Sequence, residues 1–170
     1  WQREAHSAQG SLEGVESFGE YARRNGFVPG TQVKSFEHVT CGAGLARRTG
    51  FAEGVELVRV VRVRTLDDVA RQIDHDYFLA SAVPGLTAEQ AEKSVYSYLE
   101  HNLGMRILTS RRRITVQLAT DEDCSYMDLD PYNCVAVVES QSYNSDGVMF
   151  EYTQVRHHPE LFCFTTVSRR

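Results

Sequence analysis

The chain has 170 residues, 42% hydrophobic and 24% charged, a balance typical of one globular domain. Its net charge of −5 argues against general nucleic-acid binding by this segment, which would need a basic face. No apolar stretch approaches the roughly 20 residues that span a bilayer, and no signal-peptide pattern opens the chain, so no membrane contact is expected.

The first half of the chain predicts a helix followed by several strands. Residues 1–10 are polar and aperiodic, as in a linker tail. Ser17-Phe18-Gly19-Glu20 is a capping-box pattern that opens a short helix, which ends at Asn25-Gly26. The segments that follow are a strand at 33–39, a short helix at 42–50, and alternating β-branched strands at 55–65 and 69–79 across a turn at Asp67-Asp68.

The second half adds a longer helix and more strands. Thr87-Ala88-Glu89-Gln90 is a second capping box, and the helix that it opens closes at Gly104. Its apolar positions have helical spacing: Ala91, Val95, Leu99 and Leu103. The remaining segments are a strand at 107–118, a short helix at 120–129, a hairpin of strands 134–143 and 148–156 across Asp146-Gly147, and a closing strand at 161–168. Together these segments predict an α+β fold, with a mostly antiparallel sheet and helices packed to one side.

The cysteines indicate the redox environment of the chain, and its first residue indicates whether the chain is a fragment. The four cysteines are scattered without Cys-x-x-Cys spacing: Cys41, Cys124, Cys134 and Cys163. A domain of this size needs no disulfide, so we expect free thiols in a reducing cytoplasm. Trp1 stands where an initiator Met would be, which suggests a fragment or a processed chain.

Two arginines are the first candidate site residues. Arg62 and Arg64 are two residues apart on an otherwise apolar strand, so both side chains point to the same face. Guanidinium groups suit phosphate or carboxylate in a bidentate way. The alternatives are a solvated face or structural salt bridges to Asp67 and Asp68. The basic run 111–113 is expected to be an exposed strand face.

Asp74 lies on the returning strand of the same hairpin. A three-residue loop would place Asp74 opposite Arg62, whereas a two-residue loop would flip it to the far side. The charge pattern favours the first register, since the second would send Ile73 to the polar face.

Ser17 and Ser94 are candidates because a helix N-terminus attracts anions. Ser94 would begin a new helix if residues 87–93 formed a separate turn. The simpler interpretation of both serines is capping alone.

Glu151 lies between two aromatics and is expected to face whatever covers the sheet. Asp74 and Glu151 could form a carboxylate pair, as in glycoside hydrolysis, or could simply accept hydrogen bonds from sugar hydroxyls. Adjacent strand residues point to opposite faces, so neither Asp74-His75-Asp76 nor His157-His158 is expected to bind a metal as a unit. The sequence has no Gly-x-Ser-x-Gly, phosphate-binding Gly-rich or His-Glu-x-x-His motif.

From about Gly14 onward, the order of motifs resembles the effector-binding (UTRA) domain of GntR-type regulators in the HutC subfamily. The motifs are Gly14-Val15-Glu16-Ser17-Phe18, Val61-Arg62-Val63-Arg64, Asp74-His75-Asp76-Tyr77-Phe78, Lys93-Ser94-Val95-Tyr96 and Phe150-Glu151-Tyr152-Thr153. Within that group the chain is most similar to trehalose operon repressors, in residues 73–78, 94–104 and 150–164.

This resemblance implies a chorismate-lyase-like α+β fold, a homodimer and a sugar-phosphate effector, with trehalose 6-phosphate the first choice. It implies that the phosphate is held by Arg62, Arg64, Ser94, Tyr96, Ser17 and Phe18. It implies that the sugar hydroxyls contact Asp74, Glu151 and His157. Catalysis, a cofactor and a metal are not expected.

The resemblance also implies that residues 1–12 end an interdomain linker and that operator DNA is contacted only through an N-terminal winged helix-turn-helix, which this sequence does not contain. One departure concerns residues 158–163, where trehalose repressors tend to carry basic residues but Leu161 and Cys163 lack that charge. If these positions touch the effector, the departure bears on its identity. The competing functions are a small lyase or hydrolase that uses Asp74 and Glu151, and a structural dimerisation module.

Overall fold

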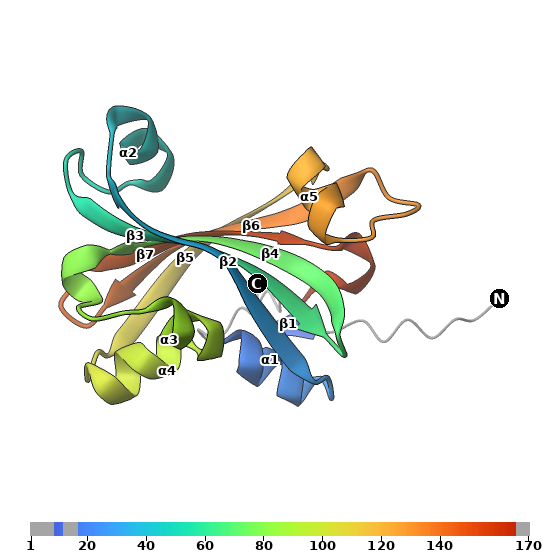
Figure 1. Cartoon of the computed structure of the whole chain (residues 1–170), viewed down its shortest axis with the longest axis horizontal. Coiled ribbons are helices and arrows are strands. Elements are labelled where there is room, and N and C mark those ends of the chain that lie inside the picture. The colour runs from blue at the N-terminus through green and yellow to red at the C-terminus, as the bar shows by residue number, and fades with distance from the viewer. Residues whose placement is uncertain (1–8, 12–16, 166–170) are drawn as a thin grey trace, which may run out of the picture.

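A six-stranded antiparallel sheet organises the structure, a computed structural model that describes residues 9–11 and 17–165 (Figure 1). The strand order is β2-β3-β4-β7-β6-β5. The strands are β2 (Pro29–Thr40), β3 (Glu56–Leu66), β4 (Val69–Leu79), β5 (Ile107–Leu118), β6 (Cys134–Asn144) and β7 (Met149–His157). A separate parallel pair joins β1 (Gln9–Ser11) to β8 (Cys163–Thr165), from opposite ends of the chain.

Short helices cover parts of both faces of this sheet. On one face lie α1 (Phe18–Arg24), α3 (Ala88–Lys93) and α4 (Val95–Ser97), and on the opposite face lie α2 (Ala43–Thr49) and α5 (Asp121–Tyr126) (Figure 1). Three further turns are helical: η1 (Ala80–Ala82), η2 (Tyr98–Asn102, a π-helix) and η3 (Pro159–Leu161). The predicted α+β class with an antiparallel sheet is confirmed, and α1, α3 and α4 gather on one side of the sheet as predicted, whereas α2 and α5 lie on the other.

The apolar core leaves one region of the helical face polar. Beneath α3 and α4, buried side chains from the helices meet those of β3, β4 and β7, among them Val95, Leu99, Val60, Phe78 and Phe150. Two further clusters fill the opposite face, beneath α5 and α2. Beside α1, the strands instead present charged and hydroxyl side chains, because polar residues occupy alternate positions there.

The β3–β4 hairpin has the predicted register but reaches it in another way. The turn has two residues, Asp67 and Asp68, both in the left-handed conformation (φ 49° and 63°). A two-residue turn alone would place Arg62 opposite Ile73, but the pairing shifts by one residue between Arg64 and Thr65. Because of this β-bulge, Arg62 lies opposite Asp74 and both side chains share a face. The predicted register is confirmed, whereas the expected three-residue loop is wrong.

The single helix predicted after Thr87 is broken. Thr87 caps α3 with the predicted capping box, but Ser94 has an extended backbone (φ −169°, ψ 115°) and starts α4. Ala91, Val95 and Leu99 are nevertheless all buried, so the spacing identified the inward face correctly. Periodicity reports which side chains are buried and does not detect a one-residue break in the backbone.

The two ends of the chain also differ from expectation. Gln9–Ser11 is a strand, although residues 1–10 read as an aperiodic tail, and the closing strand is shortened to Cys163–Thr165. The rest of the predicted linker and residues 166–168 lie outside the described residues. The four cysteines are free. Within residues 9–11 and 17–165, no helix is long and apolar enough to cross a membrane.

Candidate functional site

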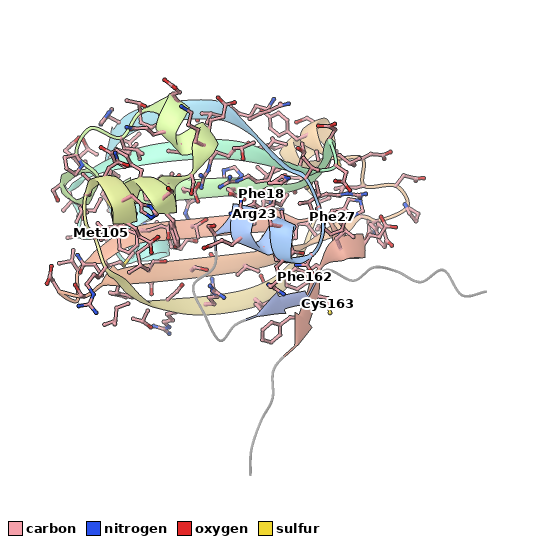
Figure 2. All side chains as sticks on the ribbon, turned by 90° about the horizontal axis from the view of Figure 1, so that it is seen from below. Phe18, Arg23, Phe27, Met105, Phe162 and Cys163 are labelled. Carbon is pink, nitrogen blue, oxygen red and sulfur yellow. The ribbon has the colours of Figure 1, made fainter. Side chains whose placement is uncertain are left out.

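A cavity of about 710 Å³ lies on the helical face of the sheet, bordered by α1, α4 and the segment after β7. Figure 2 shows this face, with Phe18 and Arg23 on α1 and with Phe162 and Cys163 near β1. This volume falls in the range of about 300–1,000 Å³ that is typical of small-molecule sites. All nine predicted site residues line it: Ser17, Phe18, Arg62, Arg64, Asp74, Ser94, Tyr96, Glu151 and His157.

Arg62 is already held by protein groups. Its Nε and Nη2 donate to Oδ2 of Asp76, at 3.0 Å and 2.6 Å, and its Nη1 donates to the carbonyl oxygen of Ala91 at 3.1 Å. Both side chains of the ion pair are buried. Arg62 therefore fastens α3 to the floor of the cavity and offers a ligand little of its hydrogen-bonding capacity.

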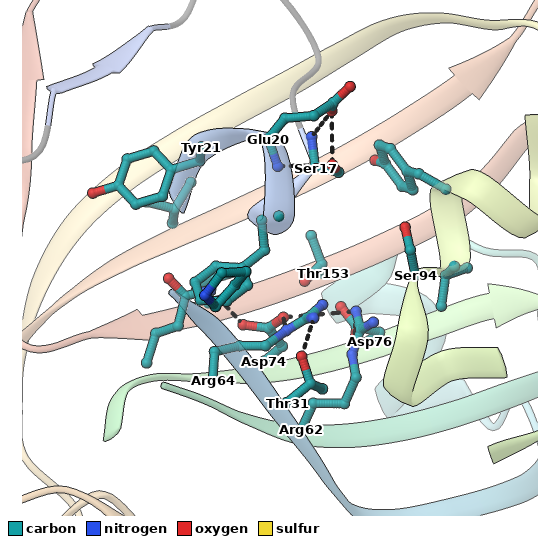
Figure 3. A pocket seen from close by; sticks show the side chains of 18 of the residues that line it. Ser17, Glu20, Tyr21, Thr31, Arg62, Arg64, Asp74, Asp76, Ser94 and Thr153 are labelled. Carbon is teal, nitrogen blue, oxygen red and sulfur yellow. Dashed lines mark hydrogen bonds and ion pairs between the residues drawn. The ribbon is translucent and has the colours of Figure 1, made fainter. Parts of the chain in front are cut away.

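Arg64 keeps a free edge. Its Nε donates to Oδ2 of Asp74 at 2.8 Å, and its Nη1 donates to the Thr31 hydroxyl at 2.8 Å (Figure 3). Within the described part of the chain, its Nη2 has no hydrogen-bond partner. The Phe18 ring lies 5.0 Å from its guanidinium carbon, in a cation–π arrangement. Arg64 is thus the arginine of the pair that can still donate to a ligand.

The paired carboxylates change the charge of the site. The sequence predicted two adjacent cations, with Asp67 and Asp68 as the alternative salt-bridge partners, but the structure pairs both arginines with Asp74 and Asp76. Burial alone would raise the pKa of Asp74, but the charges of Arg64 and Arg62 outweigh it and hold this pKa below its usual range. The cavity lining as a whole carries six Lys or Arg and six Asp or Glu side chains, so it is not a generally cationic funnel.

Glu151 is a buried acidic group of the cavity lining. Burial, with the negative charge of Asp76, raises its pKa to about 7. The Tyr96 hydroxyl donates to its Oε2 at 2.6 Å and lies 3.3 Å from the Ser142 hydroxyl. Near neutral pH this carboxyl exchanges a proton easily, and it can either donate to or accept from a hydroxyl of a ligand.

His157 lines the cavity beside an aromatic side chain. Its ring centroid lies 5.1 Å from that of Phe162, and burial lowers its pKa to about 4. The imidazole is therefore neutral at pH 7. It can exchange hydrogen bonds with a hydroxyl, but it brings no positive charge to a phosphate.

Ser17 and Ser94 both cap helices that border the cavity. The Ser17 hydroxyl accepts from the Glu20 backbone N–H at 3.3 Å and donates to the Glu20 carboxylate at 2.7 Å. The Ser94 hydroxyl accepts from the Ser97 N–H at 3.2 Å. The two helices have only seven and three residues, so their dipoles contribute little. Capping is their role in this structure, and a ligand would have to share the hydroxyls.

Several polar residues that line the cavity were not predicted as site residues, among them Asp76, Arg112 and Thr153. Asp76 and Thr153 lie two residues beyond Asp74 and Glu151, so strand alternation alone could have found them. Thr153 Oγ1 is buried and has no hydrogen-bond partner among the described residues, which is typical of a group that awaits a ligand or water. Arg111 and Arg113 are exposed as predicted, but Arg112 alternates to the cavity side.

The departure at residues 158–163 falls on the cavity wall. Leu161 and Cys163 both line the cavity, together with Phe162 and Phe164. These four side chains make this part of the cavity wall largely apolar. The described residues contain no group of three or more His, Cys, Asp or Glu side chains that could hold a metal.

Sequence comparison identifies relatives along nearly the whole chain. Residues 24–162 match the model of the UTRA domain. The HTH-type transcriptional regulator TreR of Bacillus subtilis is 32% identical over 94% of this chain and 67% of its own length. The HTH-type transcriptional repressor NagR of the same organism is 20% identical over 91% of this chain and 63% of its own length.

Structure comparison agrees with the sequence relatives. The effector-binding domain of the B. subtilis trehalose repressor TreR superimposes with a TM-score of 0.73 and 31% identity, over 83% of this chain and 98% of that one. The effector domain of PhnF from Mycobacterium smegmatis has the same fold, with a TM-score of 0.83 and 22% identity over 95% and 99% of the two chains. The chain therefore belongs to the UTRA domain family, and its relatives place it among the effector-binding domains of GntR-type transcriptional regulators.

Proposed function

We propose that this domain binds a phosphorylated sugar in the cavity beside α1, as a sensor without catalytic activity that controls operator binding by a DNA-binding domain of the same repressor. One observation carries the proposal. A single cavity joins an arginine with an unused Nη2, Arg64, to a set of hydroxyl and carboxyl groups suited to sugar hydroxyls. The sequence relationship to TreR supports trehalose 6-phosphate as the first ligand to test.

One side of the cavity suits the phosphate of the ligand, and the other side suits its sugar hydroxyls. The phosphate lies toward Arg64, Ser17 and Ser94, where charge-assisted hydrogen bonds are strongest. The sugar hydroxyls contact Asp74, Glu151 and His157, and Phe18 packs against the ligand. Tyr96 and Arg62 support the site by holding Glu151 and Asp76.

Because Leu161 and Cys163 in the cavity wall are uncharged, sugar phosphates other than trehalose 6-phosphate should also be tested. Leu161 and Cys163 bring no positive charge to the ligand, so the proposal covers phosphorylated mono- and disaccharides as a class. The unphosphorylated parent sugars are the matched comparison.

The position of α1, between the cavity and the expected linker, suggests how ligand binding could regulate DNA binding. Ligand binding draws α1 and the Ser94 end of α4 together, and α1 follows directly on the residues expected to lead to the DNA-binding domain. In a homodimer this movement changes the relative orientation of the two DNA-binding domains and weakens operator binding. Such coupling is typically about 1–3 kcal/mol and is reciprocal, so operator DNA weakens effector binding equally.

The proposal predicts a selective loss of affinity in Arg64→Ala. Isothermal titration with trehalose 6-phosphate should show binding weakened roughly 10- to 100-fold, because one charged hydrogen bond is worth about 1.5–3 kcal/mol. Arg64→Ala should bind any unphosphorylated parent sugar as the wild type does. Arg47→Ala, an exposed arginine on α2, is the control and should bind normally.

Two outcomes contradict this proposal. Equal affinity of Arg64→Ala and wild type for the sugar phosphate would remove the phosphate role of Arg64. Release of glucose or glucose phosphate during incubation would favour the enzyme alternative with Asp74 and Glu151.

A further inference from the structure

A second pocket lies on the face of the sheet that carries α2 and α5, opposite the effector cavity (Figure 1). Its volume is about 270 Å³, just below the range of about 300–1,000 Å³ that is typical of drug-sized ligands, so it suits a small solute. α2 contributes Arg48, and the start of α5 contributes Thr120 and Glu122. The two pockets have no lining residue in common.

Strand alternation builds the floor of this second pocket. His75 and Tyr77 alternate along β4 with Asp74 and Asp76, which line the effector cavity, so they project from the opposite face of the sheet. Arg59 lies directly opposite Tyr77 in the β3–β4 register. The same short stretch of β4 therefore supplies side chains to two separate pockets, back to back.

The charges of this lining are unequally distributed. Arg59 and Arg156 are ion-paired with carboxylates that lie outside the lining. Glu122, the one carboxylate of the lining, lies 3.3 Å from Nε2 of His75 at the end near α5. Arg48 forms no ion pair with any residue that the structure describes, so the end near α2 is the cationic one.

Two arginines converge on one hydroxyl at this cationic end. Nη2 of Arg48 donates to the Tyr77 hydroxyl at 2.9 Å, and its guanidinium carbon lies 5.3 Å from the ring centroid. Burial alone would lower the pKa of Arg59, but hydrogen bonds with Glu37 and with Tyr77 raise this pKa above its usual value. Guanidinium groups from α2 and β3 thus gather at a neutral phenol, and no described carboxylate is paired with both of them.

We propose that this pocket is a second ligand site, which binds the phosphate or carboxylate group of a small solute between Arg48, Arg59 and the Tyr77 hydroxyl. Guanidinium groups bind both of these oxyanions in a bidentate way. The Tyr77 hydroxyl accepts from Arg48 and can donate its own proton to the oxyanion. Thr120 and Glu122 would face polar groups at the other end of the solute. This site is independent of the sugar phosphate proposed for the effector cavity.

Amide NMR of the chain, titrated with sodium phosphate, tests the site. Phosphate should shift the signals of residues 47–49, Arg59 and Tyr77 until they saturate. Sodium chloride at equal ionic strength controls for screening and should leave these signals in place. Sodium succinate is the second probe: saturation by both anions shows a general oxyanion site, and saturation by one of them identifies the preferred group.

Arg48→Ala should weaken the binding of phosphate at these signals roughly 10- to 100-fold, as expected for one charge-assisted hydrogen bond. Arg47→Ala is the matched control, because Arg47 is the neighbouring exposed arginine of α2 but does not line the pocket. It should bind phosphate as the wild type does. Tyr77→Phe keeps the buried ring and removes only the hydroxyl, so it should also bind more weakly. Circular dichroism should show the same folded spectrum for all variants.

Equal phosphate affinity of Arg48→Ala and Arg47→Ala, or shifts that sodium chloride reproduces, would overturn the proposal. The signals of residues 17–19 and 94–97 report separately on the effector cavity. Shifts confined to these cavity signals would remove the second site and leave the proposed function standing. Saturable shifts near Arg48, without any response of the cavity signals to trehalose 6-phosphate, would support the second site and remove the sensing function.

Discussion

Glu151 is a buried carboxyl of the cavity whose burial lowers the stability of the fold near neutral pH. A buried carboxyl that faces Asp76 is costly to ionise, and the short hydrogen bond from Tyr96 offsets only part of that cost. The resulting pKa of about 7 leaves the group half protonated at the pH of most binding experiments. It can then serve a sugar hydroxyl as donor or acceptor.

Replacement by glutamine should make stability less dependent on pH. The folded-state pKa of Glu151 is raised from 4.5 to about 7, so the folded state binds the proton more tightly than the unfolded state. Its contribution to stability is complete below about pH 4.5 and is lost as the pH rises to 7, by about 3 kcal/mol. Glu151→Gln should therefore melt increasingly above the wild type between pH 4.5 and 8 in calorimetry.

The opposite titration of His157 does not disturb this comparison. Its lowered pKa makes stability fall as the pH drops from 6.5 to about 4, in wild type and variant alike. Glu53→Gln, an exposed carboxylate, controls for the change in net charge. Parallel melting curves of wild type and Glu151→Gln across this pH range would contradict the buried, uncompensated carboxyl.

Strand alternation was sufficient to predict which site residues share a face of the sheet. It placed Arg62, Arg64 and Asp74 on one face, and the structure agrees. It could not predict how the charges pair. Whether an arginine is satisfied by Asp76 or left for a ligand depends on rotamers and on the Ala91 carbonyl, which reaches the strand only through tertiary packing.

Among the elements, the β3–β4 hairpin shows the limit of local rules. The charge pattern of the two strands predicted the register, and the register in turn implied a three-residue loop. The structure keeps the register with a shorter turn and adds a bulge, since one extra residue in a strand reverses the face of everything beyond it. Hydrophobic and charged patterning fixed the pairing, and the turn adapted to it.

The break at Ser94 makes this serine both the N-cap of α4 and a residue of the cavity lining. Ser94→Asp should keep the free energy of unfolding within about 0.5 kcal/mol, because aspartate caps a helix as well as serine does. The new carboxylate faces the cavity and should repel a phosphate, so affinity for trehalose 6-phosphate should fall at least tenfold. Denaturant unfolding and calorimetric titration measure the two effects.

Thr87→Asp is the matched control for that experiment. The Thr87 side chain likewise accepts from the backbone N–H three residues on and caps α3, but it does not line the cavity. It should change neither stability nor affinity. If Ser94→Asp binds the sugar phosphate as the wild type does, the hydroxyl of Ser94 serves α4 alone.

At the scale of the whole molecule, the cavity is assembled from parts of unequal stability. Its floor consists of β3, β4 and β7, central strands joined to neighbours on both sides. Its other walls are α1, a helix of seven residues, and the segment 159–165, which adds only a three-residue strand. Central strands open only with global unfolding, whereas such short peripheral elements open locally at lower free energy.

The parallel β1–β8 pair lies in the chain on either side of these walls. It joins a strand that precedes α1 in the sequence to a strand that follows η3. No sequence pattern predicted this pair, because two three-residue strands at opposite ends of a chain have no periodicity to detect. A ligand that contacts Phe18 and Phe162 would bind both walls at once.

Hydrogen exchange should therefore locate the effect of the ligand. Saturating trehalose 6-phosphate should slow exchange most in α1 and in residues 159–165, since binding stabilises the closed form by about 2.7 kcal/mol at a hundredfold excess over Kd. The amides of β3 and β4 should change little, because global unfolding already limits their exchange. The unphosphorylated sugar at the same concentration is the control. If protection instead appeared only on the opposite face, near α2 and α5, the ligand would lie outside this cavity, and α1 would have no part in carrying the signal toward the upstream end of the chain.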